Sequence, residues 1–133
     1  QFIGRNMLIP GAVRASDGKT VTIDTPFGSL VGSSDHAASA GAKANLVLPA
    51  EAIEIHPAGG AKADLTKNYG TNHIPVTVGR TQVVGHIVQM EVVLGEGRTI
   101  TLESHADVLA GRFSPGDAAT IAWKANGATV IVE

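Results

Sequence analysis

Polar and apolar residues alternate along most of this chain, which is the pattern of β-strands. In residues 86–94 the alternation leaves one entirely apolar face, formed by Val88, Met90, Val92 and Leu94. Residues 19–24 show the same period, with Val21 and Ile23 on one face. Because successive strand side chains point to opposite sides of a sheet, these apolar faces are expected to form a core.

Turn residues divide the chain into short strands. Clusters of Gly, Pro, Asp and Ser, which favour turns, follow or precede the alternating segments. Further strands are predicted at 46–48, 53–55, 74–84, 98–103, 118–123 and 129–132. Helix signals are weak, since residues 104–111 fit only a short capped turn and residues 36–44 fit a loop as well as a helix. The chain is therefore predicted to be all-β with at most short helical turns.

An internal repeat organises these strands. Residues 17–23 match residues 96–102 position by position, and residues 9–13 match residues 74–78. Repeated segments of this kind indicate two copies of one supersecondary unit.

The repeat sets the expected boundaries. The first half covers 1–57, a small and polar linker covers 58–71, and the second half covers 72–133 with an extra hairpin at about 79–94. Short strands in each half predict two related barrels of the oligonucleotide/oligosaccharide-binding (OB) kind. Neither half is apolar enough to be stable alone, so we expect the two OB-like barrels to pack together with pseudo-twofold character.

Composition excludes several classes of function. The 133-residue chain has a formal net charge of −2 and no cysteine, so it has neither disulfides nor thiolate metal sites. Near neutrality and scarce aromatic residues argue against nucleic acid as a partner, because that role needs a basic groove with stacking side chains. No apolar run approaches the roughly 18 residues of a membrane helix.

Motifs for catalysis, cofactors and metals are missing from the sequence. No two of the 5 histidines lie within metal-ligand spacing of one another. The sequence contains no phosphate-binding G-x-x-x-x-G-K-[ST] loop and no G-x-S-x-G motif. We therefore expect no catalytic residue, no cofactor and no metal in this chain.

A few polar residues are candidates for an anion or a partner. Ser33, Ser34 and Lys43 lie in loop-like sequence, where hydroxyl and N–H donors suit an anion. Arg112 precedes a turn and is a candidate for contact with a partner protein. The alternative, polar loop residues that are simply solvated, stays open for all four.

Several short motifs, in order, resemble one family. They are Phe2-Ile3-Gly4, then Asn6 and Gly11-x-Val13, then residues 46–53, then Gly85 with its hairpin, and Phe113-x-x-Gly116-Asp117 leading to Trp123. Together they resemble the TOBE domain (transport-associated OB), which follows the ATPase domain in ABC importers. The chain departs from the family pattern at Leu48, Ala50 and Val76, where Arg, Glu and Gly are usual. If that Arg normally makes an ion pair between subunits or domains, this chain lacks it.

The resemblance implies a non-catalytic regulatory and dimerisation domain of the ATP-binding subunit of a binding-protein-dependent importer for polyamines, iron, sugars or glycerol phosphates. Its partners would be the parent ATPase domain, a second copy of the subunit, membrane permease subunits through the parent, and a regulatory protein or metabolite. ATP and Mg would belong to the ATPase domain, outside this chain. The implied location is cytoplasmic, peripheral to the inner membrane. The start of the sequence, Gln1 to Arg5, fits a cut inside a longer polypeptide.

Two other functions stay open. Gly4-Arg5-Asn6 with Gly11-x-Val13 also resembles molybdate-binding domains, which use related duplicated barrels. That resemblance implies a small-oxyanion-binding module. An independent enzyme is the third hypothesis, and no motif in the sequence supports it.

Overall fold

The computed structural model describes residues 6–34, 38–58, 62–105 and 113–132. The first half contains β1 (Asn6–Ser16), β2 (Thr20–Thr25), β3 (Gly28–Ser33), β4 (Lys43–Pro49), the 3-10 turn η1 (Ala50–Ala52) and β5 (Glu54–Pro57). The second half contains α1 (Lys62–Tyr69), β6 (His73–Val84), β7 (Ile87–Val93), η2 (Gly95–Gly97), β8 (Thr99–His105), β9 (Ala118–Ala122), η3 (Ala125–Gly127) and β10 (Thr129–Val132). The all-β prediction is confirmed.

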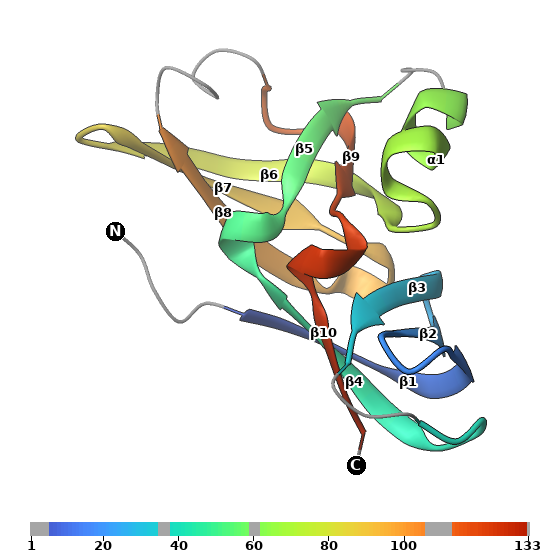
Figure 1. Ribbon diagram of the computed structural model, residues 1–133. Coiled ribbons are helices and arrows are strands. Elements are labelled where there is room, and N and C mark those ends of the chain that lie inside the picture. Colours follow the sequence, from blue (N-terminus) through green and yellow to red (C-terminus); the bar gives the residue numbers. More distant parts are fainter. Residues whose placement is uncertain (1–5, 35–37, 59–61, 106–112, 133) are drawn as a thin grey trace.

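The two sheets exchange one strand each. One is a closed barrel in the order β1-β2-β3-β10-β4, and the other is a five-stranded sheet in the order β5-β9-β6-β7-β8. Figure 1 shows β10, from the end of the chain, beside β4, and β5 beside β9. Each unit is thus completed by a strand from the other half, so the fold is a pair of interlocked OB-like units.

Strand registers reveal an internal pseudo-twofold relation. Ile9 pairs with Leu46 in the barrel, and Ile74 pairs with Ile121 in the sheet. A constant shift of 65 positions (Ile9 to Ile74) carries β1 onto β6, and a shift of 75 (Leu46 to Ile121) carries β4, η1 and β5 onto β9, η3 and β10. Pro49 and Lys124 occupy the same place in this relation, as the residues that cap η1 and η3.

The topology agrees with one part of the repeat predicted from sequence and differs from another. The match of residues 9–13 with 74–78 is confirmed by the shift of 65, whereas the match of 17–23 with 96–102 is not. By position in the sheets, β2 corresponds to β7 and β3 to β8, whereas the sequence match pairs β2 with β8. The hairpin at 79–94 is therefore the counterpart of β1–β2 with longer arms, and no strand of the second half is surplus. The match arose because a turn followed by alternating β-branched residues is a local pattern that suits more than one strand. The segment 58–71, expected as a linker, contains α1.

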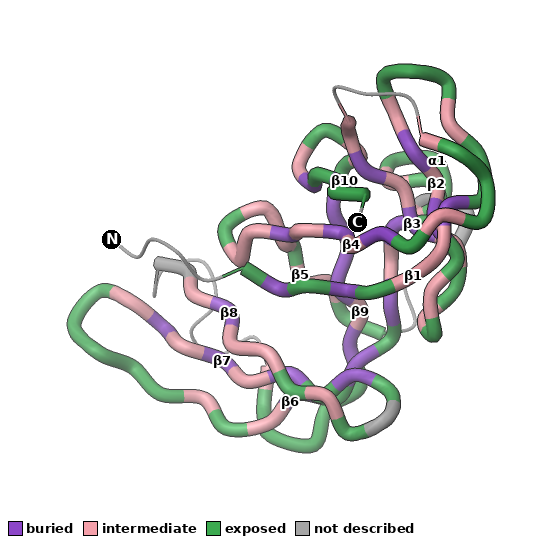
Figure 2. The backbone as a smooth tube through the Cα atoms, turned by 90° about the horizontal axis from the view of Figure 1, so that it is seen from below, coloured by how far each residue is buried: buried purple, intermediate pink, exposed green. Residues whose placement is uncertain are grey.

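The core follows the predicted alternation. Val88, Met90 and Val92 are fully buried and Leu94 nearly so, as their shared face requires. Trp123 is fully buried where β9 ends, which confirms its expected core position. In Figure 2 the buried positions alternate with exposed or intermediate ones along the strands, and the tip of the β6–β7 hairpin is exposed.

The β1–β2 turn is closed by a carboxylate. Asp17 Oδ1 accepts hydrogen bonds from the backbone N–H groups of Thr20 (2.7 Å) and Lys19 (2.9 Å). These bonds, that of Thr20 first, hold the pKa of Asp17 below its usual value. Gly18 takes the positive φ of 91° that this turn needs.

Asp17 should make stability dependent on acid pH. Its folded-state pKa is depressed, so its contribution is present above the unfolded pKa of about 3.9 and is lost as the pH falls through the folded pKa. We expect Asp17→Asn to flatten the fall of the melting temperature below about pH 4. Thermal melts between about pH 5 and pH 2 test this, and an unchanged acid slope in the variant would contradict it.

Candidate functional site

An open pocket of about 650 Å³ lies where the two units meet. Its walls come from three places in the chain: β2 and β3, the end of α1 with the loop that follows it, and the segment that leads from β9 into η3. The lining residues are Thr20, Val31, Ser33, Asn68, Tyr69, Gly70, Thr71, Asn72, Lys124, Ala125 and Asn126. The strand exchange creates this junction, because β10 enters the barrel directly after η3.

Asn72 fastens two walls of the pocket together. Its side chain accepts a hydrogen bond from the Val31 N–H (2.8 Å) and donates one to the Val31 carbonyl (2.9 Å). The backbone carbonyl of Asn72 accepts a hydrogen bond from the backbone N–H of Trp123 at 3.1 Å. Asn72 is 1% exposed, so these bonds replace water for buried polar groups. The side-chain amide of Asn72 therefore satisfies the backbone N–H and C=O of Val31 in β3, as the backbone of a neighbouring strand would.

Lys124 supplies the charge of the pocket. Among the described residues that line the pocket, Lys124 is the one lysine or arginine, and none is an aspartate or glutamate. Neutral polar groups also line the pocket, namely the hydroxyls of Thr20, Ser33 and Thr71 and the amides of Asn68 and Asn126. The hydroxyls of Thr20 and Ser33 already donate to Asp17 Oδ2 (3.2 Å) and to the Ala125 carbonyl, so the donors for a ligand are Thr71 and the two amides. A cation with hydroxyl and amide donors is a suitable set for a small anion.

Ser33 connects β3 to the opposite wall. Its Oγ donates a hydrogen bond to the carbonyl of Ala125 at 3.4 Å, across 92 positions of sequence. Thr129, just after η3, is paired with Ser33 in the parallel β10–β3 contact. These contacts hold the hydroxyl of Ser33 and the backbone next to Lys124 on facing sides of the pocket.

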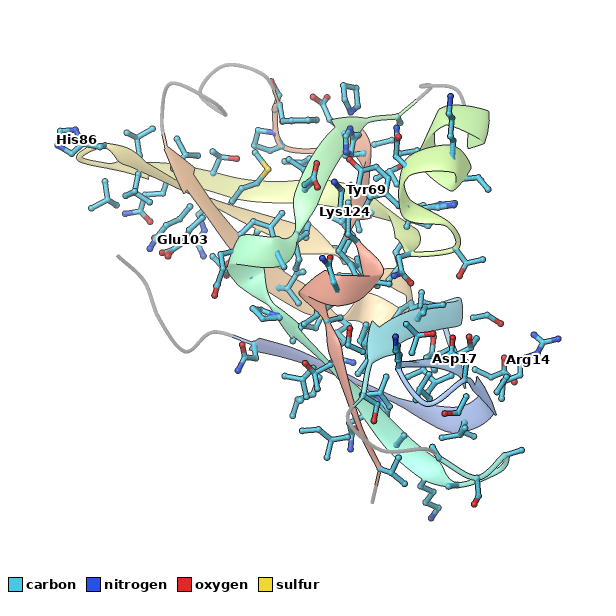
Figure 3. The ribbon with its side chains drawn as sticks, in the orientation of Figure 1. Arg14, Asp17, Tyr69, His86, Glu103 and Lys124 are labelled. Atoms are coloured by element: carbon cyan, nitrogen blue, oxygen red, sulfur yellow. The ribbon has the colours of Figure 1, made fainter. Side chains whose placement is uncertain are left out.

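Tyr69 fixes the end of α1. Its hydroxyl donates to Glu54 Oε1 (2.8 Å) and lies 3.1 Å from His56 Nε2. Burial, and then the contact with Glu54, raise the pKa of Tyr69, so the phenol is protonated at neutral pH. Figure 3 shows Tyr69 and Lys124 close to the place where β9 runs into η3. The link to β5 positions the α1–β6 loop as a wall of the pocket.

The structure separates the candidates found in the sequence. Ser33 lines the pocket, whereas Ser34 donates its backbone N–H to the carbonyl of Lys19 at 2.9 Å and does not line it. Lys43 pairs with Ala12 at the beginning of β4. Thr129 pairs with Ser33 on one side and with Val47 of β4 on the other, so Val47 marks the position of Ser33 along β4. Lys43 lies four residues, or roughly 13 Å, along β4 from Val47 and is therefore distant from Ser33. Arg112 lies outside the described residues.

Lys124 was missed by sequence reasoning. It directly follows a predicted strand and lies beside Trp123, which draws attention to packing rather than to charge. The signal that could have identified Lys124 is the comparison with the other half, where the same position holds the uncharged Pro49. The two copies therefore differ in charge at this position.

Two further features bear on function. Among the described residues, no three His, Asp or Glu side chains come together as ligands for a metal ion. No helix in that part of the chain has the length and apolarity to cross a membrane.

Comparisons with known proteins establish the fold and the family separately. A structural neighbour is the cytoplasmic molybdate-binding protein ModG, in a crystal form with molybdate bound, with a TM-score of 0.78 and 19% sequence identity over 100% of both chains. At this identity the likeness establishes the fold, a ModG-like duplication of OB units. A search of curated protein sequences gave no match. The TOBE domain family model matches residues 35–131, so the chain belongs to the TOBE domain family.

Proposed function

We propose that this chain binds one small tetrahedral oxyanion of the molybdate class in the Lys124 pocket. The carrying observation is the charge of the described part of the lining, where the Lys124 ammonium stands with neutral polar groups and without a carboxylate. A hydrogen bond to an ionised group contributes about 1.5–3 kcal/mol, and several neutral donors add to it. The structural neighbour ModG, which was crystallised with molybdate bound, supports the same chemistry.

The arrangement of the lining is also compatible with a compact oxyanion. Ser33 and Lys124 lie on facing walls that are tied together by the Ser33–Ala125 hydrogen bond. A compact anion that accepts in several directions can use hydroxyl, amide and ammonium donors together. Binding of this kind involves no catalytic step, and we place the protein in the cytoplasm by analogy with ModG, which is a cytoplasmic protein.

Calorimetric titration tests the proposal. We expect molybdate or tungstate to give saturable heat, weaker at high ionic strength because salt screens the exposed Lys124. Sulfate and phosphate in parallel titrations measure selectivity. No heat with any of the four anions would exclude this function.

The importer role is a second candidate. The TOBE family match over residues 35–131 supports it. In that reading the chain is the regulatory part of an ATP-binding subunit, with the ATPase domain, a second copy, permease subunits and a regulator as partners. Sedimentation over a wide concentration range tests the dimerisation part, and a monomer at every concentration would count against it.

A further inference from the structure

A polar groove of about 230 Å³ lies on the sheet formed by β6, β7 and β8. Its described lining residues are Arg80, Gln82, Gln89, Glu91 and Thr101, and none of them lines the Lys124 pocket. Gln89 and Glu91 alternate with the buried Met90 along β7, so the groove is on the side of the sheet away from the core. Pockets for drug-sized ligands usually measure about 300–1,000 Å³, so this groove suits a smaller molecule.

A β-bulge brings opposite charges together in this groove, which we call the bulge groove. The pairing of β6 with β7 shifts between Val78 and Thr81. The two residues inside the bulge, Gly79 and Arg80, lie opposite the single residue Glu91. A Cβ atom at residue 79 would lie 3.3 Å from the Glu91 carbonyl oxygen and 3.7 Å from its carboxylate Oε1. The Glu91 side chain therefore lies against the glycine, next to Arg80 in the chain.

Neither charge in the bulge groove is neutralised. Within the described part of the chain, the Arg80 guanidinium and the Glu91 carboxylate form no ion pair and no hydrogen bond with any other side chain. Arg80 is exposed and Glu91 is half-buried. Two opposite charges that line one groove without pairing leave both groups available to a ligand.

The barrel supplies an internal comparison. Val13 corresponds to Val78 under the shift of 65, and the pairing of β1 with β2 also has a bulge directly after it. The residue in that bulge, Arg14, donates hydrogen bonds to Asp24 at 3.5 Å and to Ser29 at 3.1 Å. The charge at the barrel bulge is therefore neutralised within the chain, whereas the charges at the β6 bulge stay apart.

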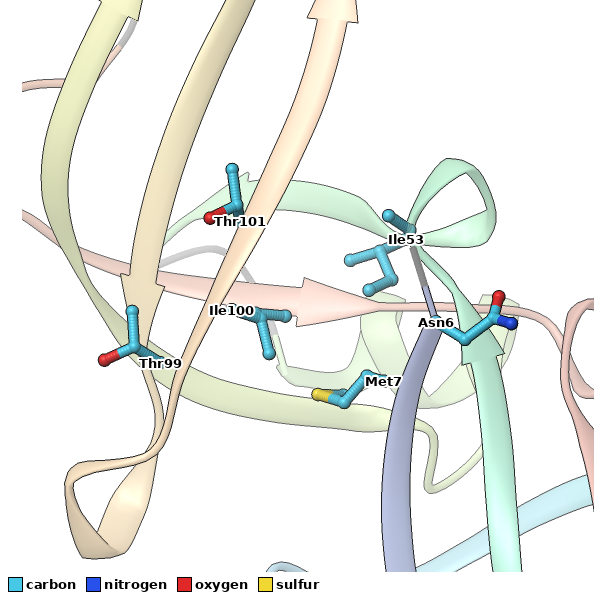
Figure 4. Close-up of a pocket in the computed structure, with 7 residues that line it drawn as sticks. Asn6, Met7, Ile53, Thr99, Ile100 and Thr101 are labelled. Atoms are coloured by element: carbon cyan, nitrogen blue, oxygen red, sulfur yellow. The ribbon is translucent and has the colours of Figure 1, made fainter. Parts of the chain in front are cut away.

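Neutral groups complete the bulge groove. The Gln89 amide donates a hydrogen bond to Glu103 at 2.7 Å, which leaves its carbonyl oxygen as an acceptor. Gln82 and Thr101 add an amide and a hydroxyl. Thr101 also lines the neighbouring pocket of about 400 Å³ that Figure 4 shows. Of these two cavities, the bulge groove is the one with a cation and an anion among its described lining residues.

We propose that the bulge groove binds a small zwitterion, such as a free α-amino acid, with its carboxylate at Arg80 and its ammonium group at Glu91. A guanidinium donates in a planar fork that fits a carboxylate, and a carboxylate accepts hydrogen bonds from an ammonium group. A simple anion meets the repulsion of Glu91, and a simple cation meets that of Arg80, so a molecule with both charges is favoured. The site is separate from the Lys124 pocket and does not depend on the oxyanion function.

Titration of the complete, isotope-labelled chain by NMR tests the proposal. Glycine is the zwitterionic probe, and acetate and methylammonium, each with one of its charges, are added in parallel at the same ionic strength. We expect glycine to shift the amide signals of residues 79–82, 89–91 and 101 saturably, in the millimolar range because the groove is open to solvent. Acetate and methylammonium should bind at least about threefold more weakly, because each loses one charged contact.

Substitutions assign the two contacts. Arg80→Gln and Glu91→Gln should each weaken glycine binding by about threefold to tenfold. The double exchange Arg80→Glu, Glu91→Arg should bind glycine more tightly than either single variant, because it keeps both charges with their places reversed. Arg14→Gln is the matched control, since it removes the arginine of the barrel bulge, and its affinity for glycine should equal that of the wild type.

The spectrum of each variant without ligand shows whether it is folded, and if a Glu91 variant is not, Arg80→Gln at its exposed position decides the question. The absence of shifts with glycine would overturn the proposal. Equal affinities for glycine and acetate would overturn it as well, since they describe a site for anions only. Shifts confined to the pocket in Figure 4 would place the ligand elsewhere. Equal losses in Arg14→Gln and Arg80→Gln would show that only net charge matters, against the contacts assigned to the groove.

Discussion

Lys124→Ala is expected to weaken molybdate binding roughly 10- to 100-fold, because the pocket loses the one ammonium group among its described lining residues. A hydrogen bond to a charged group contributes about 1.5–3 kcal/mol, and about 1.4 kcal/mol is a tenfold change in affinity. The remaining hydroxyl and amide donors explain why some affinity should persist. Calorimetry at low ionic strength measures the change.

The stability of the Lys124→Ala protein should be nearly that of the wild type. Lys124 is exposed, and although it is the N-cap residue of η3 its side chain makes no capping hydrogen bond. Exposed substitutions without such a role change stability by about 0.5 kcal/mol or less. Lys43→Ala is the matched control, since Lys43 is an exposed lysine on β4 that does not line the pocket. Equal losses of affinity in both variants would show that only net charge matters. An unchanged affinity in Lys124→Ala would place the anion elsewhere.

Asn72→Ala is expected to destabilise the fold by about 2–4 kcal/mol. The substitution removes both partners of Val31 at once, and a buried group left without a partner costs about 1–3 kcal/mol. The two bonds to Val31 are partly buried, so each is expected to contribute in the lower part of that range. Whole domains are stable by only about 5–15 kcal/mol, so the loss is a large share of the total. Urea denaturation should show a lower midpoint with a similar slope.

Asn72→Met separates hydrogen bonding from packing. Methionine is the residue at the corresponding position, Met7, and it fills space without replacing the two bonds to Val31. If those bonds stabilise the fold, Asn72→Met should be destabilised nearly as much as Asn72→Ala. Asn68→Ala serves as the control because Asn68 is exposed, and we expect it to stay within about 0.5 kcal/mol of the wild type. If Asn72→Met is as stable as the wild type, the destabilisation of Asn72→Ala comes from the cavity that alanine leaves and not from the lost hydrogen bonds.

Much of the fold could be predicted from local patterns. The alternation in residues 86–94 identifies buried Val88, Met90 and Val92 because a half-buried strand must send every second side chain inward. The all-β class and the duplication follow from the same kind of pattern. The match of residues 9–13 with 74–78 gave the right register for β1 and β6. The counterpart of β2 could not be obtained this way, since several strands share the same turn and β-branched residues.

The site was harder to predict because it is built from distant parts of the chain. Ser33 was among the candidates and lines the pocket, while Ser34 and Lys43 have similar polarity and lie outside it. Nothing in the local sequence around Lys124 indicates that it lines the same pocket as Ser33. Hydroxyl and ammonium groups occur in many loops. They form a binding site only where the fold brings several of them to the same pocket, and that placement is what separates a site from solvated polar residues.

The sequence by itself determined the strands, their buried faces, the two related halves and the absence of catalytic motifs, because each of these is a property of neighbouring residues. The tertiary structure decided the exchange of β5 and β10, which are four residues each and carry no local signal for their partners. That exchange joins β3 to η3 and so brings Ser33 to the segment with Lys124, across 92 positions between Ser33 and Ala125. Pairing over such a separation depends on the closure of the whole barrel, which no window of sequence contains.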